Sequence, residues 1–208
     1  NIVEKLKSIR NLRKKPFFDN KTQLDLNCIL ISAFVKAHEI LPENEYLKSA
    51  KELYQLIEKK FKNFQIYHSY SKDISFLEDY AYLINASLDL ADATLEVNYR
   101  LNAKKLCEDV LKKFYIKEKK IFQKNQIVKN DIFCEPVDIS DHTISNGNSI
   151  MLSNFSRLGM LEEAKELADS LNGYLNIYKN YMLSSLRAID YFETTSSGKK
   201  CNDEGCNI

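Results

Sequence analysis

The sequence predicts an all-α protein built from helical hairpins, and three observations support this fold class. The 208 residues include only 5 Gly and 3 Pro, so few residues interrupt a helix. Apolar residues recur at helical spacing in most of the chain. One amphipathic segment also recurs 53 residues later, since YLKSAKELYQLIEKKF at 46–61 aligns with YRLNAKKLCEDVLKKF at 99–114. This repeat is too long for tetratricopeptide or ankyrin units and indicates the hairpins of an (α/α) toroid.

The expected helices alternate between two types. Apolar helices are predicted at 24–41, 76–93 and 148–159, and amphipathic helices follow the first two at 46–61 and 99–114. A weaker copy of the amphipathic segment is marked by AKEL, which occurs at 50–53 and again at 164–167. A helix that is apolar all round must be covered, whereas an amphipathic helix lies outside it. The prediction is therefore two layers, with 24–41 and 76–93 inside and 46–61 and 99–114 outside.

The remaining segments complete the predicted architecture. A last tyrosine-rich helix is expected at 174–192, and the aromatic and β-branched segments 64–70 and 120–128 are expected to form small β-hairpin strands on one face. The chain holds just under four repeats, whereas a closed toroid has six, and its first residue is not Met. We therefore expect an incomplete arc of about four hairpins, the C-terminal part of a longer protein. Residues 1–192 form this partial toroid domain, and 193–208 form a flexible polar tail.

Charge and cysteine usage exclude several classes of function. The net charge of +1 leaves no basic surface for nucleic acid or an anionic membrane, and the longest apolar run, near 28–35, is too short to span a bilayer. The five cysteines do not form the framework of a secreted disulfide protein, so a cytoplasmic location is the expectation. Cys28 and Cys107 are expected to be buried thiols. Cys201 and Cys206 have no further Cys or His nearby, and neither a metal nor a cofactor is expected.

Two adjacent carboxylates begin the most apolar helix, in the sequence SFLEDYAYL at 75–83. Ser75 followed by Glu78 is the pattern of a capping box, in which the serine caps the helix and the glutamate reaches back to the cap. This assigns Glu78 a structural role. Asp79 instead falls on the apolar side of the helix, beside Leu83. Two interpretations stay open for Asp79, a solvated acid in the first turn or a residue that lines a cavity.

Three motifs resemble a known family. RKKPFFDNKTQLDLNCILISA at 13–33 is similar to the R-x-x-P-x-x-D-D-K-x-L-T-S-W-N-G-L-M-I block of the YyaL-like, spermatogenesis-associated thioredoxin-domain-containing proteins. FLEDYAYLI at 76–84 resembles F-L-(D/E)-D-Y-A-x-L-I of that family, and DHTISNGNS at 141–149 resembles D-G-A-x-P-S-G-N-S. The terminal Cys201 and Cys206 are similar to a C-x₄-C pattern there. The order and spacing of these motifs agree along nearly the whole chain.

The resemblance implies a fold, a partner and a set of site residues. Family members join a thioredoxin-like domain to a six-hairpin toroid related to acylglucosamine 2-epimerases and glycosidases, so a sugar-like ligand and a thioredoxin-like domain of the same protein are the implied partners. The implied catalytic residues are Asp79, Asp19 and Asp141. The implied substrate-binding residues are Lys21, Asn27, Tyr80, Gly147, Asn148 and Ser149. Asn20 stands where the family has a second Asp, Leu26 replaces its Trp, and the chain contains no Trp, which indicates a diverged site.

The chemistry of these residues leaves alternatives. Asp19, Asp79 and Asp141 would supply the pair of carboxylates that a glycosidase needs. Of the three histidines, only His142 lies in a motif, where it is either a catalytic or a surface residue. NGNS at 146–149 is either a turn with a helix cap or a cradle for an anion or a sugar hydroxyl. Two function classes follow, a carbohydrate-active toroid of epimerase, isomerase or glycosidase type, and a non-catalytic helical module that partners a thioredoxin-like domain.

Overall fold

The computed structural model describes residues 1–41, 44–60, 66–69, 74–126 and 136–196. The elements in chain order are α1 (Ile2–Asn11), α2 (Leu24–Ile40), α3 (Asn44–Lys60), α4 (Leu77–Thr94), α5 (Val97–Lys113), β1 (Tyr115–Ile116), β2 (Ile121–Phe122), α6 (Gly147–Leu158), α7 (Leu161–Tyr178), the 3-10 helix η2 (Lys179–Tyr181) and α8 (Leu183–Ser196).

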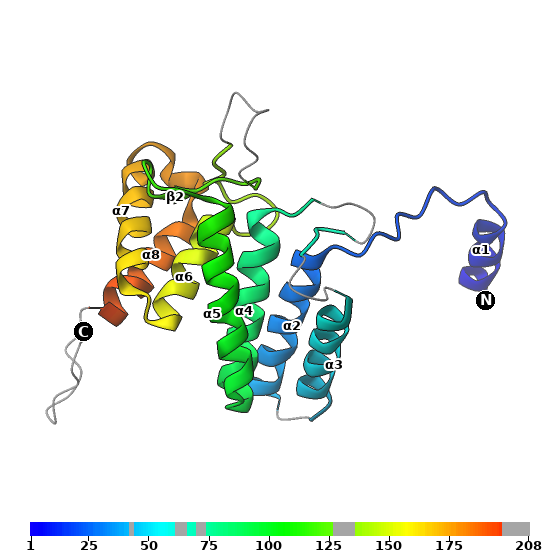
Figure 1. The fold of residues 1–208 in the computed structure, drawn as a ribbon. Helices are drawn as coiled ribbons and strands as arrows, with labels where there is room; N and C mark the ends of the chain where they lie inside the picture. Colours follow the sequence, from blue (N-terminus) through cyan, green and yellow to red (C-terminus); the bar gives the residue numbers. More distant parts are fainter. Residues whose placement is uncertain (42–43, 61–65, 70–73, 127–135, 197–208) are drawn as a thin grey trace, which may run out of the picture.

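The long helices form two rows, as the repeat predicts (Figure 1). The inner row runs α2, α4, α6 and α8, each packed on the next, and the outer row is α3, α5 and α7, each packed on the inner helix that precedes it in the chain. Ala50, Ala103 and Ala164, which the repeat aligns, are all fully buried on the outer helices. Small side chains at these positions let the two rows approach closely. The predicted layer order of the helices at 24–41, 76–93, 46–61 and 99–114 is confirmed.

The central inner helix α4 is covered on most sides, because α2, α5 and α6 all contact it. Its side chains from Leu77 to Ala91 are buried almost without interruption. By contrast, α2 buries only one side, and Leu26 and Leu30, one turn apart, are 48% and 43% exposed. The expectation that α2 is covered like α4 is therefore wrong. The reason is its place at the end of the row, where no described element packs on the side that carries Leu26 and Leu30.

Three polar residues of α4 fasten it to its neighbours near its C-terminal end. Arg157 of α6 forms ion pairs of 2.8 Å with Asp89 and with Asp92, and it donates a hydrogen bond of 3.1 Å to Asn85. Asn85 in turn donates to Ser32 of α2 at 3.1 Å. This network links three inner helices at the end of the molecule opposite to the first turn of α4.

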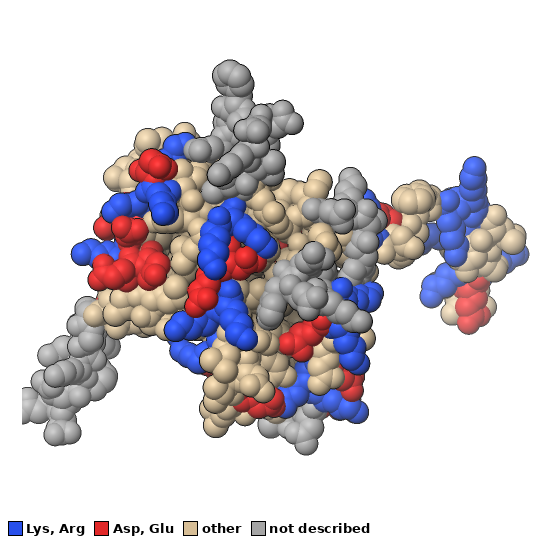
Figure 2. Space-filling model, in the orientation of Figure 1, with Lys and Arg blue, Asp and Glu red and all other residues tan. Residues whose placement is uncertain are grey.

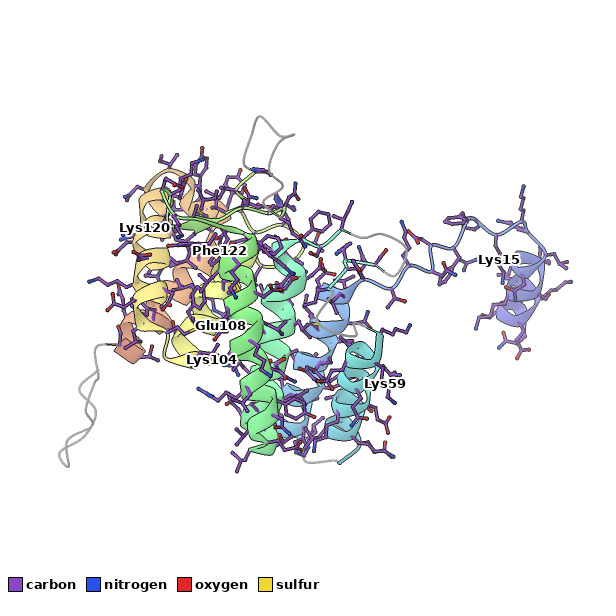
Figure 3. The ribbon with its side chains drawn as sticks, viewed as in Figure 1. Lys15, Lys59, Lys104, Glu108, Lys120 and Phe122 are labelled. Carbon is purple, nitrogen blue, oxygen red and sulfur yellow. The ribbon has the colours of Figure 1, made fainter. Side chains whose placement is uncertain are left out.

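Two sequence predictions about the last third of the chain need correction. The helix expected at 174–192 is divided, because α7 ends at Tyr178 and α8 begins only at Leu183, with η2 between them. The hairpin strands expected at 64–70 and 120–128 are reduced to β1 paired antiparallel with β2, while the described residues 66–69 contribute one bridge, from Ser69 to Gln23. Lys120 and Phe122 belong to the β1–β2 hairpin, which lies beside α7 (Figure 3). No larger sheet occurs in the described part of the chain.

The two ends of the chain differ from the compact helical body. Helix α1 buries none of its residues and stands apart from the other helices in Figure 1. Helix α8 continues to Ser196, past the predicted domain boundary at 192, and the rest of the predicted tail lies outside the described residues. Cys134, Cys201 and Cys206 also lie outside them, whereas Cys28 and Cys107 are buried free thiols, as predicted.

The surface carries both signs of charge. Lys and Arg are interspersed with Asp and Glu over the face shown in Figure 2, in agreement with the net charge of +1. Lys104 and Glu108, for example, lie one turn apart on the exposed side of α5 (Figure 3). Within the described residues, none of the helices combines the length and hydrophobicity needed to cross a bilayer.

Candidate functional site

The first turns of α2, α4 and α6 lie together at one end of the arc. The backbone N–H of Leu24 donates to the His68 carbonyl at 3.0 Å, and that of Leu77 donates to the Lys124 carbonyl at 2.9 Å. These bonds hold the segments around His68 and Lys124 against the starts of α2 and α4. Gly147, the first residue of α6, packs so closely on Leu77 that an added Cβ would lie 2.8 Å from that side chain. Three inner helices are thereby aligned at the same level.

A cavity of about 290 Å³ opens where these segments meet. Carboxylates and nitrogen donors share its wall, which is a lining suited to a polar, hydroxyl-rich ligand. Its lining residues are Asp25, His68, Phe76, Glu78, Lys124, Asp138, Ser140, His142, Thr143, Ile144, Ser145 and Asn146.

A second cavity of about 420 Å³ adjoins the first, because His68 and Phe76 line both of them. Asp19 and Lys21, two of the predicted site residues, lie on its wall together with Gln23. The side chains of Asp19 and Lys21 are exposed and form an ion pair of 3.1 Å. An exposed pair of this kind contributes little to stability and leaves both groups open to a ligand.

The sequence predicts Glu78 as the capping residue and Asp79 as a candidate cavity residue, and the structure reverses these two roles. Helix α4 begins at Leu77 with Phe76 as its N-cap, one residue later than the Ser75 cap required. The third helical position is therefore Asp79, whose Oδ2 accepts a hydrogen bond of 2.8 Å from the backbone N–H of Phe76. The capping box of Ser75 and Glu78 is wrong because Phe76 is held in an extended conformation by its bridge to Asn125.

Asp79 is completely buried and is paired with His68. Its Oδ1 lies 2.9 Å from His68 Nδ1, and the other ring nitrogen of His68, Nε2, lies 3.0 Å from the amide nitrogen of Gln23. Since an amide nitrogen only donates, His68 carries its proton on Nδ1 in this arrangement and donates it to Asp79. Burial raises the pKa of Asp79 to about 6, although the hydrogen bonds from Phe76 and His68 lower it.

Glu78, and not Asp79, faces the first cavity. Its Oε2 is buried and receives no hydrogen bond from any described residue. Burial raises the pKa of Glu78 above its ordinary value, and its own backbone amide and the charge of Lys124 lower it only in part. Lys124 is itself held by Asp138, at 3.0 Å. Glu78 is thus a carboxyl group with one oxygen unused by the protein, at the edge of a cavity.

Asp141, a predicted catalytic residue, is an anchor for the start of α8. Its Oδ2 accepts a hydrogen bond of 2.8 Å from the backbone N–H of Ser184, and its Oδ1 accepts from the backbone and side-chain nitrogens of Asn146 at 3.1 and 3.0 Å and from the Ser184 hydroxyl. Burial alone would raise the pKa of Asp141, but these hydrogen bonds outweigh it, so that the pKa lies below the ordinary 3.8. All its oxygens are occupied by the fold.

The NGNS segment is also used by the fold. Asn146 caps α6 by accepting from the backbone N–H of Ser149 at 2.9 Å, as one of the two sequence interpretations proposed. Asn148 is completely buried, and its amide bonds the N–H and the carbonyl of Phe122, both at 3.0 Å, and the carbonyl of Asp138 at 3.1 Å. Asn146 lines the first cavity, whereas Asn148 and Ser149 do not.

Two further predicted site residues lie apart from both cavities. Tyr80 is buried between α4 and α5, where its hydroxyl accepts a hydrogen bond of 2.8 Å from Lys113. Asn27 donates from its side chain to the Gln23 carbonyl at 2.6 Å. The structure thus brings Asp19 and Lys21 to one cavity and Asp79 behind the wall of the other, but it does not gather the predicted residues into one site.

Sequence reasoning missed Asp25, His68, Lys124 and Asp138 as cavity residues. His68 lies in no sequence motif, and no motif includes Asp25 as a site residue. One signal was available for Asp25, because LDLN at 24–27 and LEDY at 77–80 both place an acid in the first turn of an apolar helix. For Lys124 and Asp138 no local pattern marks a site, since their 3.0 Å ion pair joins residues fourteen positions apart in the chain.

We predict that Asp141 makes the stability of the protein depend on pH. Because its pKa in the folded state lies below 3.8, its stabilising effect is complete above that pH and decreases as the pH falls through the folded-state pKa. The Asp141→Asn variant should lose about 1–3 kcal/mol of unfolding free energy at pH 7. It should also show a smaller loss of stability between pH 5 and about pH 3 than the parent.

Urea unfolding at a series of pH values measures both effects. The matched control is Asp169→Asn, which removes an exposed acid of α7. If the two variants have the same stability at pH 7, Asp141 does not anchor α8.

Comparison with known proteins places the fold. No protein-family model and no curated protein matches the chain. Solved structures do match. One is a GH76 α-mannanase of Bacteroides thetaiotaomicron, with a TM-score of 0.69 and 13% sequence identity over 89% of this chain and 55% of the mannanase chain. Another is cellobiose 2-epimerase of Bacillus thermoamylovorans, with a TM-score of 0.61 and 14% sequence identity over 87% of this chain and 62% of the epimerase chain.

A third match is an inactive variant of the α-1,6-mannanase GH76A of Salegentibacter sp. HEL1_6 in complex with α-1,6-mannotriose, at a TM-score of 0.61 and 14% identity, over 81% of this chain and 53% of that one. Two consecutive aspartates are replaced by asparagine in that variant. The chain spans little more than half the length of these structures, and identities this low establish the fold alone. The predicted fold class is confirmed: the chain has the helical-hairpin fold of six-hairpin, glycosidase-like (α/α) toroids.

Proposed function

We propose that this protein binds a mannose-type sugar in the 290 Å³ cavity and that Glu78 is its acid–base group. The observation that carries the proposal is the free oxygen of Glu78, which is buried, lies at the first turn of a central inner helix and accepts no hydrogen bond from the described residues. A buried acceptor without a partner costs free energy. Because the Glu78 side chain lines the cavity, a small rotation of its carboxyl group would let a ligand there donate to this oxygen.

The remaining wall of the cavity supplies complementary groups. Lys124 and His142 offer nitrogen donors, and Asp25 and Asp138 offer acceptors, around a volume at the small end of ligand sites. A sugar ring presents donors and acceptors on every carbon and can bond to such a mixed wall. Phe76 supplies the one aromatic hydrocarbon face, in place of the tryptophan platform that the chain lacks.

The similar structures support the sugar and the role of Glu78. They are a mannanase, an epimerase and a mannanase bound to mannotriose. The bound mannanase was made inactive by replacing two consecutive aspartates, and Glu78 and Asp79 are likewise consecutive acids. In the proposed site only the first of the pair meets the ligand. Glu78 would protonate the departing glycosidic oxygen while a water attacks the anomeric carbon and gives its proton to a second carboxylate of the same wall, Asp25 or Asp138. Asp79 would fix the start of α4 and the orientation of His68.

The test is a product assay combined with a binding measurement. The parent is incubated with α-1,6-mannotriose, cellobiose and mannose, products are separated by chromatography, and affinities are measured by calorimetry. Glu78→Gln preserves the size of the side chain, so we expect binding within a few-fold of the parent and turnover lower by about 10²–10⁴-fold. Glu108→Gln, on the exposed side of α5, is the matched control and should behave like the parent. Full turnover by Glu78→Gln would exclude Glu78 as the acid–base group.

A second function is favoured by one observation, the exposed apolar side of α2. Leu26 and Leu30 form a row there that no described element covers. A non-catalytic module that docks a thioredoxin-like domain, as the resemblance to the YyaL-like family implies, would use such a row. Under that alternative, Leu30→Glu would abolish association with a thioredoxin-like domain, and none of the three sugars would bind.

A further inference from the structure

A cluster of three metal-binding side chains lies at the base of the first cavity. Asp25 comes from the first turn of α2, Asp79 from the first turn of α4, and His68 from the segment between the two hairpins. One carboxylate oxygen of each aspartate and one ring nitrogen of His68 all lie within 4.8 Å of one another. Ligand atoms that bind one ion at about 2.1 Å are about 3–4 Å apart, so small side-chain rotations would bring these three onto one ion.

No lysine or arginine of the described residues balances the negative charge of this cluster. Asp25 is 7% exposed and Asp79 is 0% exposed, yet among the described residues neither pairs with a lysine or arginine. The one lysine on the cavity wall, Lys124, is engaged by Asp138 at 3.0 Å. Two carboxylates taken out of water with only an imidazole between them are costly, and a divalent cation would neutralise both.

The ligand atoms are also available. Within the described chain, the carboxylate of Asp25 accepts one hydrogen bond, from the backbone N–H of Leu26 to Oδ1 at 2.8 Å, while its residue lines the cavity. No described residue donates to its second oxygen, although the residue is more than nine-tenths buried. Oδ2 of Asp79 accepts the capping hydrogen bond from the Phe76 N–H, and Oδ1 lies 2.9 Å from His68 Nδ1.

His68 can present Nδ1 as a ligand because Gln23 supports either form of the ring. Gln23 contacts Nε2 at 3.0 Å through its side-chain amide. Rotation of that amide by half a turn places its oxygen there, so that Nε2–H donates to Gln23 and Nδ1 becomes free to bind a metal. A neutral acceptor behind the second ring nitrogen is the usual support of a metal-binding histidine.

We propose that Asp25, His68 and Asp79 bind a divalent cation of the Mn²⁺ and Zn²⁺ class. Two carboxylate oxygens and one imidazole nitrogen suit these ions better than Ca²⁺ or Mg²⁺, which prefer oxygen alone. Asp25 and His68 line the 290 Å³ cavity, so that water or a ligand hydroxyl there would complete the coordination shell. This site goes beyond the proposed sugar binding and does not depend on it. It differs from the sequence-based expectation that the protein holds no metal.

The test is metal binding by the chelator-treated chain without any sugar. Calorimetric titration with Mn²⁺ and Zn²⁺ should give one equivalent bound and a higher thermal midpoint, with weaker binding of Mg²⁺ and Ca²⁺. Asp25→Asn and His68→Gln, both close in shape to the parent residues, should weaken binding more than about 100-fold, and Gln23→Leu by about 10–100-fold. Asp138→Asn, which changes an acid on the same cavity wall outside the cluster, should leave the affinity unchanged.

Two outcomes would overturn the proposal. One is that the parent binds none of the four ions. The other is that folded Asp25→Asn and His68→Gln bind Mn²⁺ as tightly as the parent, which would place the ion elsewhere. A spectroscopic measurement on the parent alone remains decisive if a variant fails to fold: electron-spin-echo spectra of bound Mn²⁺ should show one directly coordinated imidazole nitrogen, and spectra without it contradict the assignment.

Discussion

Replacing Arg157 with Met is expected to lower the free energy of unfolding by about 3–5 kcal/mol. The Arg157 side chain is only 18% exposed and pairs with Asp89, which is 10% exposed, at 2.8 Å. Removing the guanidinium leaves a nearly buried carboxylate without its cation, and the free-energy cost comes mainly from that orphaned charge. The ion pair of Arg157 with Asp92 and its hydrogen bond to Asn85 would also be lost, and this would loosen the packing of α6 on α4.

The matched control is Arg100→Met on α5, whose ion pair with Asp92 is 3.6 Å long and exposed on both sides. We expect it to cost less than about 1 kcal/mol. The double variant Arg157→Met with Asp89→Asn should recover part of the lost stability, because the orphaned charge is gone. Denaturant unfolding measures all three. Equal stability of Arg157→Met and Arg100→Met would show that the network does not hold the inner row together.

The second large effect is expected for Asn148→Ala, at about 3 kcal/mol or more of unfolding free energy. The substitution leaves the N–H and carbonyl of Phe122 and the carbonyl of Asp138 without the amide that bonds them in a fully buried place. Each buried polar group left unpaired costs about 1–3 kcal/mol. Because the amide fixes both β2 and the 136–146 loop, its loss should also widen the cavity.

Thermal and denaturant unfolding test this expectation. Asn102→Ala is the control, since the Asn102 amide bonds Glu58 at an exposed position on the outer row, and it should cost less than about 1 kcal/mol. A marginal change in Asn148→Ala together with a complete loss of sugar binding would instead support the role that the family resemblance implied, direct contact of Asn148 with substrate.

The helical architecture could be predicted because it depends on local and periodic features. Ala50 and Ala103 occupy the same place in the repeat, and both are fully buried where an outer helix meets an inner one. The break between α7 and α8 could not be predicted in this way. The segment from 174 to 192 has helical character throughout. Helix α7 nevertheless ends at Tyr178, and α8 starts separately at Leu183, where a distant acid, Asp141, accepts a hydrogen bond from the N–H of Ser184.

The candidate site was predicted only in part for the same reason. The position of Asp79 at the start of a buried helix marked it as unusual, and it is fully buried beside a histidine. A shift of one residue in the helix start, caused by the bridge from Phe76 to Asn125, then decided that Asp79 forms the cap and Glu78 faces the cavity. Asp25 and His68 meet Asp79 only through tertiary packing, which no spacing in the sequence encodes.

The central claim is that the cavity at the first turns of α2, α4 and α6 is the ligand site. A crystal structure of the chain soaked with α-1,6-mannotriose tests it most directly. The account predicts a sugar ring inside the cavity, with a hydroxyl or glycosidic oxygen within about 3.2 Å of a Glu78 carboxylate oxygen and further contacts to Lys124 and Asp138. The account would be contradicted by a sugar bound elsewhere, for example along Leu26 and Leu30 of α2, with only water in the cavity and no sugar atom in contact with Glu78.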